Sequence, residues 1–238
     1  MLDFLGTVVI AAVMVVNLNS FISTADIARA SRLRLAIGVG LWIGVATAVA
    51  GAGFLAQAQP VVGIFVTLPI LTAILLASRY PAARAALISV PMPLLVGLNV
   101  SRVFGGFFLM LAAVDRLSGP FPYSAGWGDI ITGVLALPAV WLAMRASSGG
   151  DRLLALWNAF GALDLIAAVM LGITSANTSP FQLLHVGVGP AAILTLPWSL
   201  VPTVLVPFYL IVHGIIALQL HQRAGQPREL SAAARRIA

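Results

Sequence analysis

Two charged residues interrupt long apolar stretches of the sequence, and they are the first candidates for chemistry. Arg102 and Asp164 each have an almost uncharged stretch on both sides. An ionisable side chain at the bilayer centre costs at least about 2.5–3.5 kcal/mol on insertion scales, so it needs a partner or a cavity. Counted from the ends of their predicted helices, both lie about 18–20 Å deep. This equal depth predicts an ion pair between them.

Polar residues at helical spacing accompany both charges. Asn99 precedes Arg102 by three residues, and Trp157 precedes Asp164 by seven, so each shares a helix face with its charged neighbour. Two interpretations stay open for the pair. It forms a gate or proton site for a transported solute, or it is a structural pair that fixes the helix bundle.

Asp129 is a third acidic residue in an apolar stretch, within the run Gly126-Trp127-Gly128-Asp129. If its helix begins at residue 126, Asp129 lies one turn inside and is stabilised there by the helix dipole. The alternative is that Asp129, Trp127 and Tyr123 line an outward-facing entrance to a cavity that holds Arg102 and Asp164.

A further polar set falls in the opposite half of the predicted membrane domain. It consists of Asn17, Asn158, Tyr209 and His213. Tyr209 and His213 are four residues apart and therefore share a helix face. They can relay protons or hold a polar ligand. The alternative is that they hydrogen-bond to neighbouring helices, at about 0.6 kcal/mol for each contact.

Several kinds of chemistry find no support in the sequence. There is no Cys, and there is no Lys, so a retinal Schiff base is excluded. His185, His213 and His221 fall at different depths, so a bis-His haem is not expected. No HExxH motif predicts a metal site, and no phosphate-binding loop or GxSxG elbow is present. We therefore predict no cofactor and no metal, and we do not favour an enzyme.

The composition defines the kind of element that must position these residues. Of 238 residues, 61% are hydrophobic and 8% are charged, whereas soluble domains have about 45–50% apolar and about 25% charged residues. The sequence predicts an all-α, polytopic integral membrane protein in contact with the lipid bilayer. Its single membrane domain, 1–220, has seven helices of about 20 residues each. They are predicted at about 2–23, 33–56, 61–78, 88–114, 126–145, 153–175 and 199–220.

The arginines predict an orientation, because loops that stay in the cytoplasm retain positive charge. Eleven of the 13 arginines fall in alternate loops and in the Arg-rich tail 221–238. The opposite loops carry only Arg116, and Arg102 lies inside a helix. We expect the N-terminus outside and the C-terminus in the cytoplasm. Since the positive charge is scattered over short loops, no nucleic-acid partner is expected.

Two other features concern the surroundings of the bundle. The segment 176–198 is uncharged and rich in Gly and Pro, which predicts an interfacial or re-entrant piece that caps the outer surface. Trp198 is expected in the headgroup region at its end. Gly40 and Gly44 have GxxxG spacing, which permits a homo-oligomer.

The sequence leaves three classes of function open. The first is a small-solute secondary transporter or channel-like permease, with its charged site at the midplane between the fourth and sixth helices. The second is a non-catalytic membrane assembly or partner subunit. The third is an intramembrane lipid-, cofactor- or ligand-binding protein or enzyme, with a pocket near Tyr209 and His213. Arg without Lys, together with abundant Ala and Gly, indicates a bacterial inner membrane.

Overall fold

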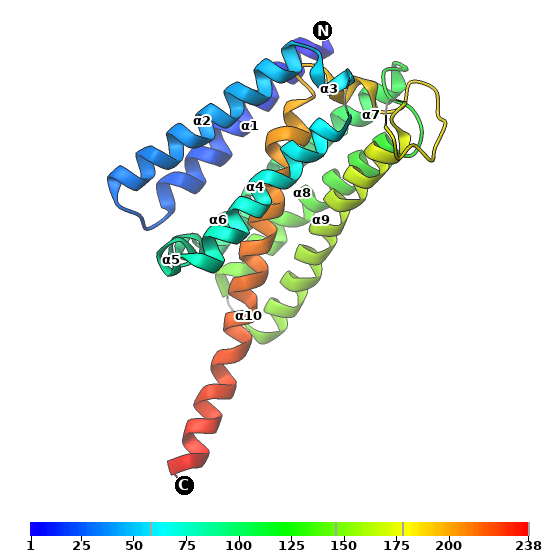
Figure 1. The fold of residues 1–238 in the computed structure, drawn as a ribbon. Helices are drawn as coiled ribbons and strands as arrows, with labels where there is room; N and C mark the ends of the chain where they lie inside the picture. Colours follow the sequence, from blue (N-terminus) through cyan, green and yellow to red (C-terminus); the bar gives the residue numbers. More distant parts are fainter. Residues whose placement is uncertain (58, 146, 178, 238) are drawn as a thin grey trace.

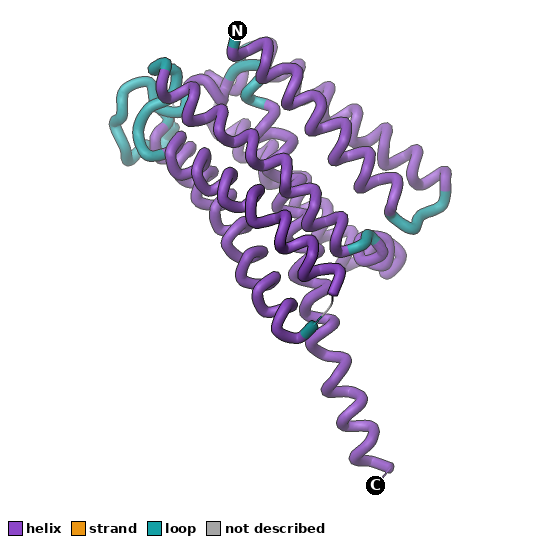
Figure 2. Tube along the Cα trace, turned by 180° about the vertical axis from the view of Figure 1, so that it is seen from behind, coloured by secondary structure: helices purple, strands orange, loops and turns teal. Residues whose placement is uncertain are grey.

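The computed structural model describes residues 1–57, 59–145, 147–177 and 179–237, with side chains for all of these except 59, 60, 148 and 226–237. These residues form helices and loops without a strand (Figure 2), so the predicted all-α class is confirmed. Seven of the described helices are long and apolar enough to cross a membrane. This is the pattern of a multi-pass membrane protein.

The long helices are continuous, except for the fourth and seventh spans. The continuous ones are α1 (Leu2–Thr24), α2 (Arg29–Gly51), α4 (Gln59–Arg79), α8 (Phe121–Arg145) and α9 (Ser148–Ser175). The fourth span consists of α6 (Met92–Leu98), the 3₁₀ segment η1 (Asn99–Gly105) and α7 (Gly106–Ala113). The seventh consists of the π segment η3 (Val201–Leu205) and α10 (Val206–Ile237). Short helices α3 (Phe54–Gln57), α5 (Pro81–Ser89) and η2 (Ala191–Leu194) lie in the connections.

Proline placement explains where the fourth span begins. The sequence predicts a start near residue 88, but α5 ends at Ser89 and the span starts at Met92. Val90 is extended, with φ −65° and ψ 125°, because a residue before proline is pushed out of the helical region. Pro91 is then the N-cap of a new helix and Pro93 its second residue, positions at which a missing N–H breaks no intrahelical bond.

The seven spans differ in how far the protein itself buries them. Residues of α10 are central: 67% of its spanning window is buried, against 11% for that of α2. Figure 1 shows α1 and α2 side by side at one flank of the bundle, with α10 running through its middle. The functional site is therefore built around α10.

The two ends of the bundle need names. We call the end that carries Met1, η2 and the loop after α7 the N-terminal end, and the opposite end, where α10 leaves the bundle, the C-terminal end (Figure 1). At the C-terminal end α10 continues to Ile237, through the predicted tail 221–238. Arg228, Arg235 and Arg236, which contribute to the predicted charge asymmetry, lie outside the residues whose side chains are described.

Glycines on α8 bring the fourth and sixth spans close to it. A Cβ at Gly133 would fall 2.7 Å from the backbone nitrogen of Val103 in η1, and one at Gly126 would fall 2.8 Å from Leu109 in α7. A Cβ at Gly128 would overlap the carboxylate of Asp164 in α9. Because small residues allow helix backbones to approach closely, α8 can hold its two neighbours against one buried site.

The segment 176–198 covers part of the N-terminal end, but Trp198 is not the exposed anchor that the sequence predicts. Phe181 and Leu183 are exposed, whereas Trp198 is 1% exposed. Its ring lies against Gly6 in α1 and 5.4 Å from the ring of Phe107, centroid to centroid. Gly6 has no side chain, so the indole can enter the bundle instead of remaining at its rim.

Candidate functional site

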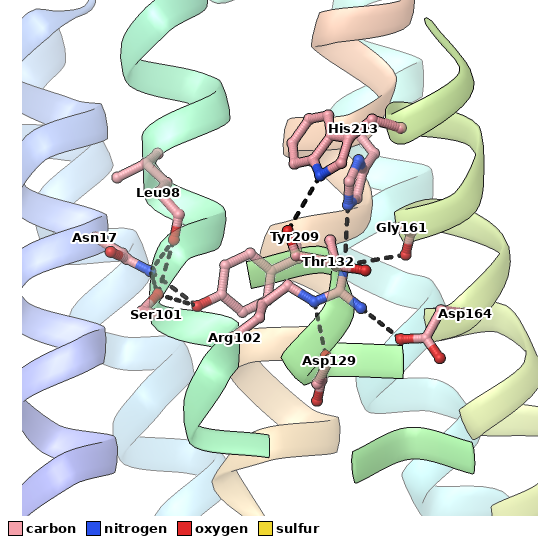
Figure 3. Close-up of polar contacts among 11 residues, drawn as sticks. Asn17, Leu98, Ser101, Arg102, Asp129, Thr132, Gly161, Asp164, Tyr209 and His213 are labelled. Atoms are coloured by element: carbon pink, nitrogen blue, oxygen red, sulfur yellow. Dashed lines mark hydrogen bonds and ion pairs between the residues drawn. The ribbon is translucent and has the colours of Figure 1, made fainter. Parts of the chain in front are cut away.

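The guanidinium of Arg102 is the centre of a buried polar cluster (Figure 3). Its Nη2 donates to Asp164 Oδ2 at 2.6 Å, so the predicted ion pair is present. Its Nε donates to Asp129 Oδ1 at 2.7 Å. Its Nη1 donates to the Gly161 carbonyl at 3.0 Å and lies 3.1 Å from His213 Nε2. One cation thus lies between two carboxylates that come from two different helices.

The position of Asp129 differs from the predicted cap. Helix α8 begins at Phe121, so Asp129 lies more than two turns inside it, beyond the reach of the helix-end dipole. Gly105, at the end of η1, makes room for its side chain, since a Cβ there would overlap Asp129. The charge of Asp129 is therefore balanced by Arg102 and not by a helix terminus.

The hydrogen bonds around His213 define its protonation. Arg102 has only donors, so His213 Nε2 must accept the bond from Nη1. The proton then lies on Nδ1, which is 2.8 Å from Asn158 Oδ1 and donates to it. Asn158 in turn donates from Nδ2 to the His213 carbonyl at 3.1 Å. This pattern requires a neutral imidazole with a fixed tautomer.

Tyr209 lies on the other side of Arg102, with the centroid of its ring 5.9 Å from the guanidinium carbon. Its hydroxyl is 2.7 Å from Ser101 Oγ and receives a bond from Asn17 Nδ2 at 2.9 Å. Because Ser101 donates to the Leu98 carbonyl, Tyr209 is the donor to Ser101. Asn17 and Tyr209 therefore lie in the same region as Arg102. The sequence had predicted them in the opposite half of the membrane domain.

Trp157 and Asn99 lie close to the cluster without contacting Arg102 through a hydrogen bond. Trp157 Nε1 donates to the Thr132 carbonyl at 3.1 Å, and its ring lies 5.7 Å from that of His213. Asn99 is fully buried and donates to the Leu95 carbonyl at 3.0 Å. Trp157 supports the imidazole, and Asn99 satisfies a backbone carbonyl near the start of η1.

A cavity of about 100 Å³ ends at this cluster, several times the space of about 10–15 Å³ that one water needs. Its polar lining comes from Ser101, Arg102, Asp129 and Tyr209, and the rest is almost entirely apolar. The lining residues belong to the parts of the helices nearest the N-terminal end.

Of the three residues in the predicted entrance, Asp129 lines the cavity, but the prediction is wrong for Tyr123 and Trp127. Both are more than half exposed on the surface of the bundle, and neither lines the cavity. Asp129 points into the bundle. Trp127 lies two residues earlier in α8, so helical spacing places it on the opposite face of the helix. Ile193, Leu194 and Trp198 line the cavity nearer the N-terminal end instead.

Three contributors to the site were not predicted from the sequence. Ser101 lies next to Arg102 in the sequence, and this position was the available signal. The Gly161 carbonyl has no side-chain signal at all. The third is at the rim, where Asp3 Oδ1 accepts from Arg116 Nη1 and from Trp198 Nε1, both at 2.7 Å.

Comparison with known proteins places the chain in a family. Residues 59–221 match the profile of a family described as Domain of unknown function (DUF8737). The chain belongs to this family. The matched segment holds Arg102, Asp129, Asp164 and His213, while α1, with Asn17, precedes it. No curated protein and no solved structure matches the chain.

The acidic and imidazole groups of the site surround a guanidinium instead of a metal position. Within the described part of the chain, no group of three or more His, Asp or Glu side chains could hold a metal ion. The arrangement therefore offers an apolar cavity whose inner end is a charged, hydrogen-bonded cluster.

Proposed function

We propose that this protein is a permease of the bacterial inner membrane that carries a small solute with an apolar body and one polar group. The observation that carries this proposal is the largely apolar cavity that ends on Arg102 and Asp129 midway along the helices. An apolar pocket with a few convergent polar groups is the usual form of a small-molecule site. The charged cluster around Arg102, at the inner end of the cavity, lies where a transported solute would have to pass.

The packing beyond the cluster supports alternating access. On the side of the C-terminal end, Leu154, Val212 and Ile216 have no exposed surface. The cavity therefore stops at the cluster, and a solute cannot continue without a rearrangement. This arrangement corresponds to one of the two states of a secondary transporter, with the cavity on the N-terminal side of the cluster.

We place the N-terminal end outside the cell and the C-terminal end in the cytoplasm. Arg79, Arg145 and Arg223 lie at or near the last turns of spanning helices that end at the C-terminal end. Cytoplasmic loops carry such an excess of arginine. In this orientation the cavity faces the outside.

Accessibility of a single cysteine tests the proposal without knowledge of the solute. The chain has no Cys, so Ala168→Cys introduces one thiol into the cavity lining. A permease exposes it alternately to both sides, so a membrane-impermeant cationic methanethiosulfonate should modify it in right-side-out and in inside-out vesicles. Modification from neither side, or from one side only, contradicts transport through this cavity.

Two matched variants control the labelling experiment. Ala167→Cys places the thiol one residue away, on the exposed outer surface of α9, where lipid excludes the reagent. It should stay unmodified in both vesicle preparations. Ala224→Cys, exposed on α10 at the C-terminal end, should react only in inside-out vesicles, which checks the proposed orientation.

A ligand-binding protein that does not move its ligand is the second candidate, favoured by one observation. Ile193, Leu194 and Trp198 are all buried and line the cavity toward the N-terminal end, as expected for a retained ligand. This function predicts an amphipathic molecule that copurifies at one per chain and is visible by native mass spectrometry. It also predicts that Ala168→Cys is protected from both sides until that molecule is extracted.

A further inference from the structure

We propose that the ligand of this cavity is a monocationic amphiphile, an alkylammonium, that binds at Asp129 in exchange for a proton held by the Arg102–Asp129–Asp164 cluster. This inference rests on the proposed function of the cavity and names the class of solute. It follows from three features of the site: its charge, the direction in which that charge is exposed, and the hydrogen bonds that Arg102 already makes within the protein.

The first feature is the charge of the cluster. Arg102 contributes one positive charge, Asp129 and Asp164 contribute one negative charge each, and His213 is neutral because it accepts a bond from Arg102. With both carboxyls ionised, the cluster carries one negative charge in excess. An unbalanced charge at membrane depth is costly, so the empty site holds one proton and the loaded site needs one cation.

The second feature is that the excess charge is turned toward the cavity. Asp129 lines the cavity and its side chain is 13% exposed, whereas that of Asp164 is 7% exposed and does not belong to the lining. Arg102 bonds to Oδ1 of Asp129, and Oδ2 accepts no hydrogen bond from the described residues. An ammonium group can donate to Oδ2, a charge-assisted bond of the strong type.

The third feature is that Arg102 has little left to offer an anion. All three of its nitrogens donate to partners within the protein, with Asp129, Asp164, Gly161 and His213 as acceptors. A carboxylate would raise the negative excess from one to two charges, and a phosphate monoester would raise it further. The apolar lining beyond the cluster instead accommodates an alkyl chain.

Proton exchange follows from the same count, with charge conserved. An alkylammonium enters, its N–H group bonds to Asp129, and one proton leaves the cluster, so the site remains neutral. The titratable and charged groups that the packed elements turn toward Asp129 are Arg102 from η1, Asp164 from α9, and Tyr209 and His213 from α10. Of these, only the two carboxyls share the exchangeable proton.

Three probes of equal chain length test the charge preference: decylamine, decan-1-ol and decanoate. Binding to the purified, detergent-solubilised protein is counted by native mass spectrometry at pH 7. We expect one decylamine per chain, bound about tenfold or more tightly than decan-1-ol, and no specific binding of decanoate. Asp129→Asn removes the excess charge, so the ratio between decylamine and decan-1-ol should fall to about one by the same reasoning.

Asp151→Asn is the matched control, since Asp151 pairs with Arg223 far from the cavity. It should keep the wild-type ratio. If Asp129→Asn does not fold, the pH dependence of the wild type decides. Exchange against one proton makes decylamine affinity rise by up to about tenfold per pH unit between pH 6 and 8, and decan-1-ol affinity stay constant.

The outcomes separate this inference from the proposed function. Equal binding of decylamine and decan-1-ol, preference for decanoate, or pH-independent decylamine binding overturns the cationic ligand while the cavity stands as an amphipathic site. Binding of none of the probes overturns the proposed function as well. Ala168→Phe should fill the cavity and abolish binding, so binding that persists in this variant locates the probe elsewhere and also counts against both.

Discussion

At the scale of single residues, Arg102 links four segments of the bundle through one side chain. It belongs to η1 and bonds to side chains or carbonyls of α8, α9 and α10. The desolvation of a buried ion pair is offset only when its geometry is good and its other hydrogen bonds are satisfied. Here the geometry is good at both carboxylates, so the cluster is sensitive to loss of its one cation.

Arg102→Leu should therefore be strongly destabilising. It leaves Asp129 and Asp164 buried without their counter-charge, for which we expect a loss of about 3–5 kcal/mol in the free energy of unfolding. Arg223→Leu breaks the partly exposed pair with Asp151 and should cost less than about 1 kcal/mol. Unfolding followed by tryptophan fluorescence measures both. A similar small loss for the two variants would show that the cluster contributes little to stability.

The residue types in the sequence predicted only part of this cluster. Arg102 and Asp164 were predictable because a charge inside an apolar span needs a partner. For Asp129, stabilisation by a helix end was predicted beside a position at the cavity, and the first interpretation failed because the start of its helix was set five residues too late, at 126 instead of Phe121. The Gly161 carbonyl could not be predicted, since every residue has one and only the fold selects which is used.

At the scale of the elements, α8 determines how closely the charged helices approach. Its glycines face η1, α7 and α9 at the points where those elements carry the site. The sequence predicted the seven spans but not the change from α to 3₁₀ geometry in η1, nor the π segment η3. Apolar patterning indicates which residues are buried, whereas the coiling of a segment depends on the neighbours against which it packs.

Gly128→Ala tests the approach of α8 and α9. The new methyl group would overlap the carboxylate of Asp164, and overpacking of this kind costs about 1–3 kcal/mol. Gly214→Ala is the matched control, because a Cβ at Gly214 in α10 meets no described atom within 4 Å. It should leave the free energy of unfolding unchanged or raise it by about 0.5–1 kcal/mol. Equal stability of Gly128→Ala and wild type would mean that the helices can separate at no cost.

At the scale of the whole molecule, the N-terminal end is fastened by contacts between distant parts of the chain. Asp3 joins the start of α1 to Arg116 after α7 and to Trp198 before η3. Trp198 also lines the cavity. In contrast, two glycines of α2 face open space: a Cβ at Gly40 or Gly44 meets no described atom within 4 Å. The homo-oligomer through these glycines stays a prediction.

Asp3→Leu should loosen this end more than Arg116→Leu. The first change leaves the Trp198 indole N–H buried without its acceptor, at a cost of about 1–3 kcal/mol. The second removes only a partly exposed ion pair, worth about 1 kcal/mol or less. Thermal unfolding of the two variants provides the comparison. A larger loss for Arg116→Leu would assign the fastening to the ion pair.

The 3₁₀ geometry of η1 makes the position of the Arg102 charge depend on local winding. A 3₁₀ helix rises about 2.0 Å and turns about 120° per residue, against about 1.5 Å and 100° for an α-helix. Rewinding the seven residues Asn99–Gly105 as α-helix would shorten the segment by about 3.5 Å. Arg102, at its middle, would therefore turn about the axis of the segment and shift along it relative to Asp129 and Asp164. A change of pitch in this one segment would thus shift the guanidinium along the axis of the fourth span.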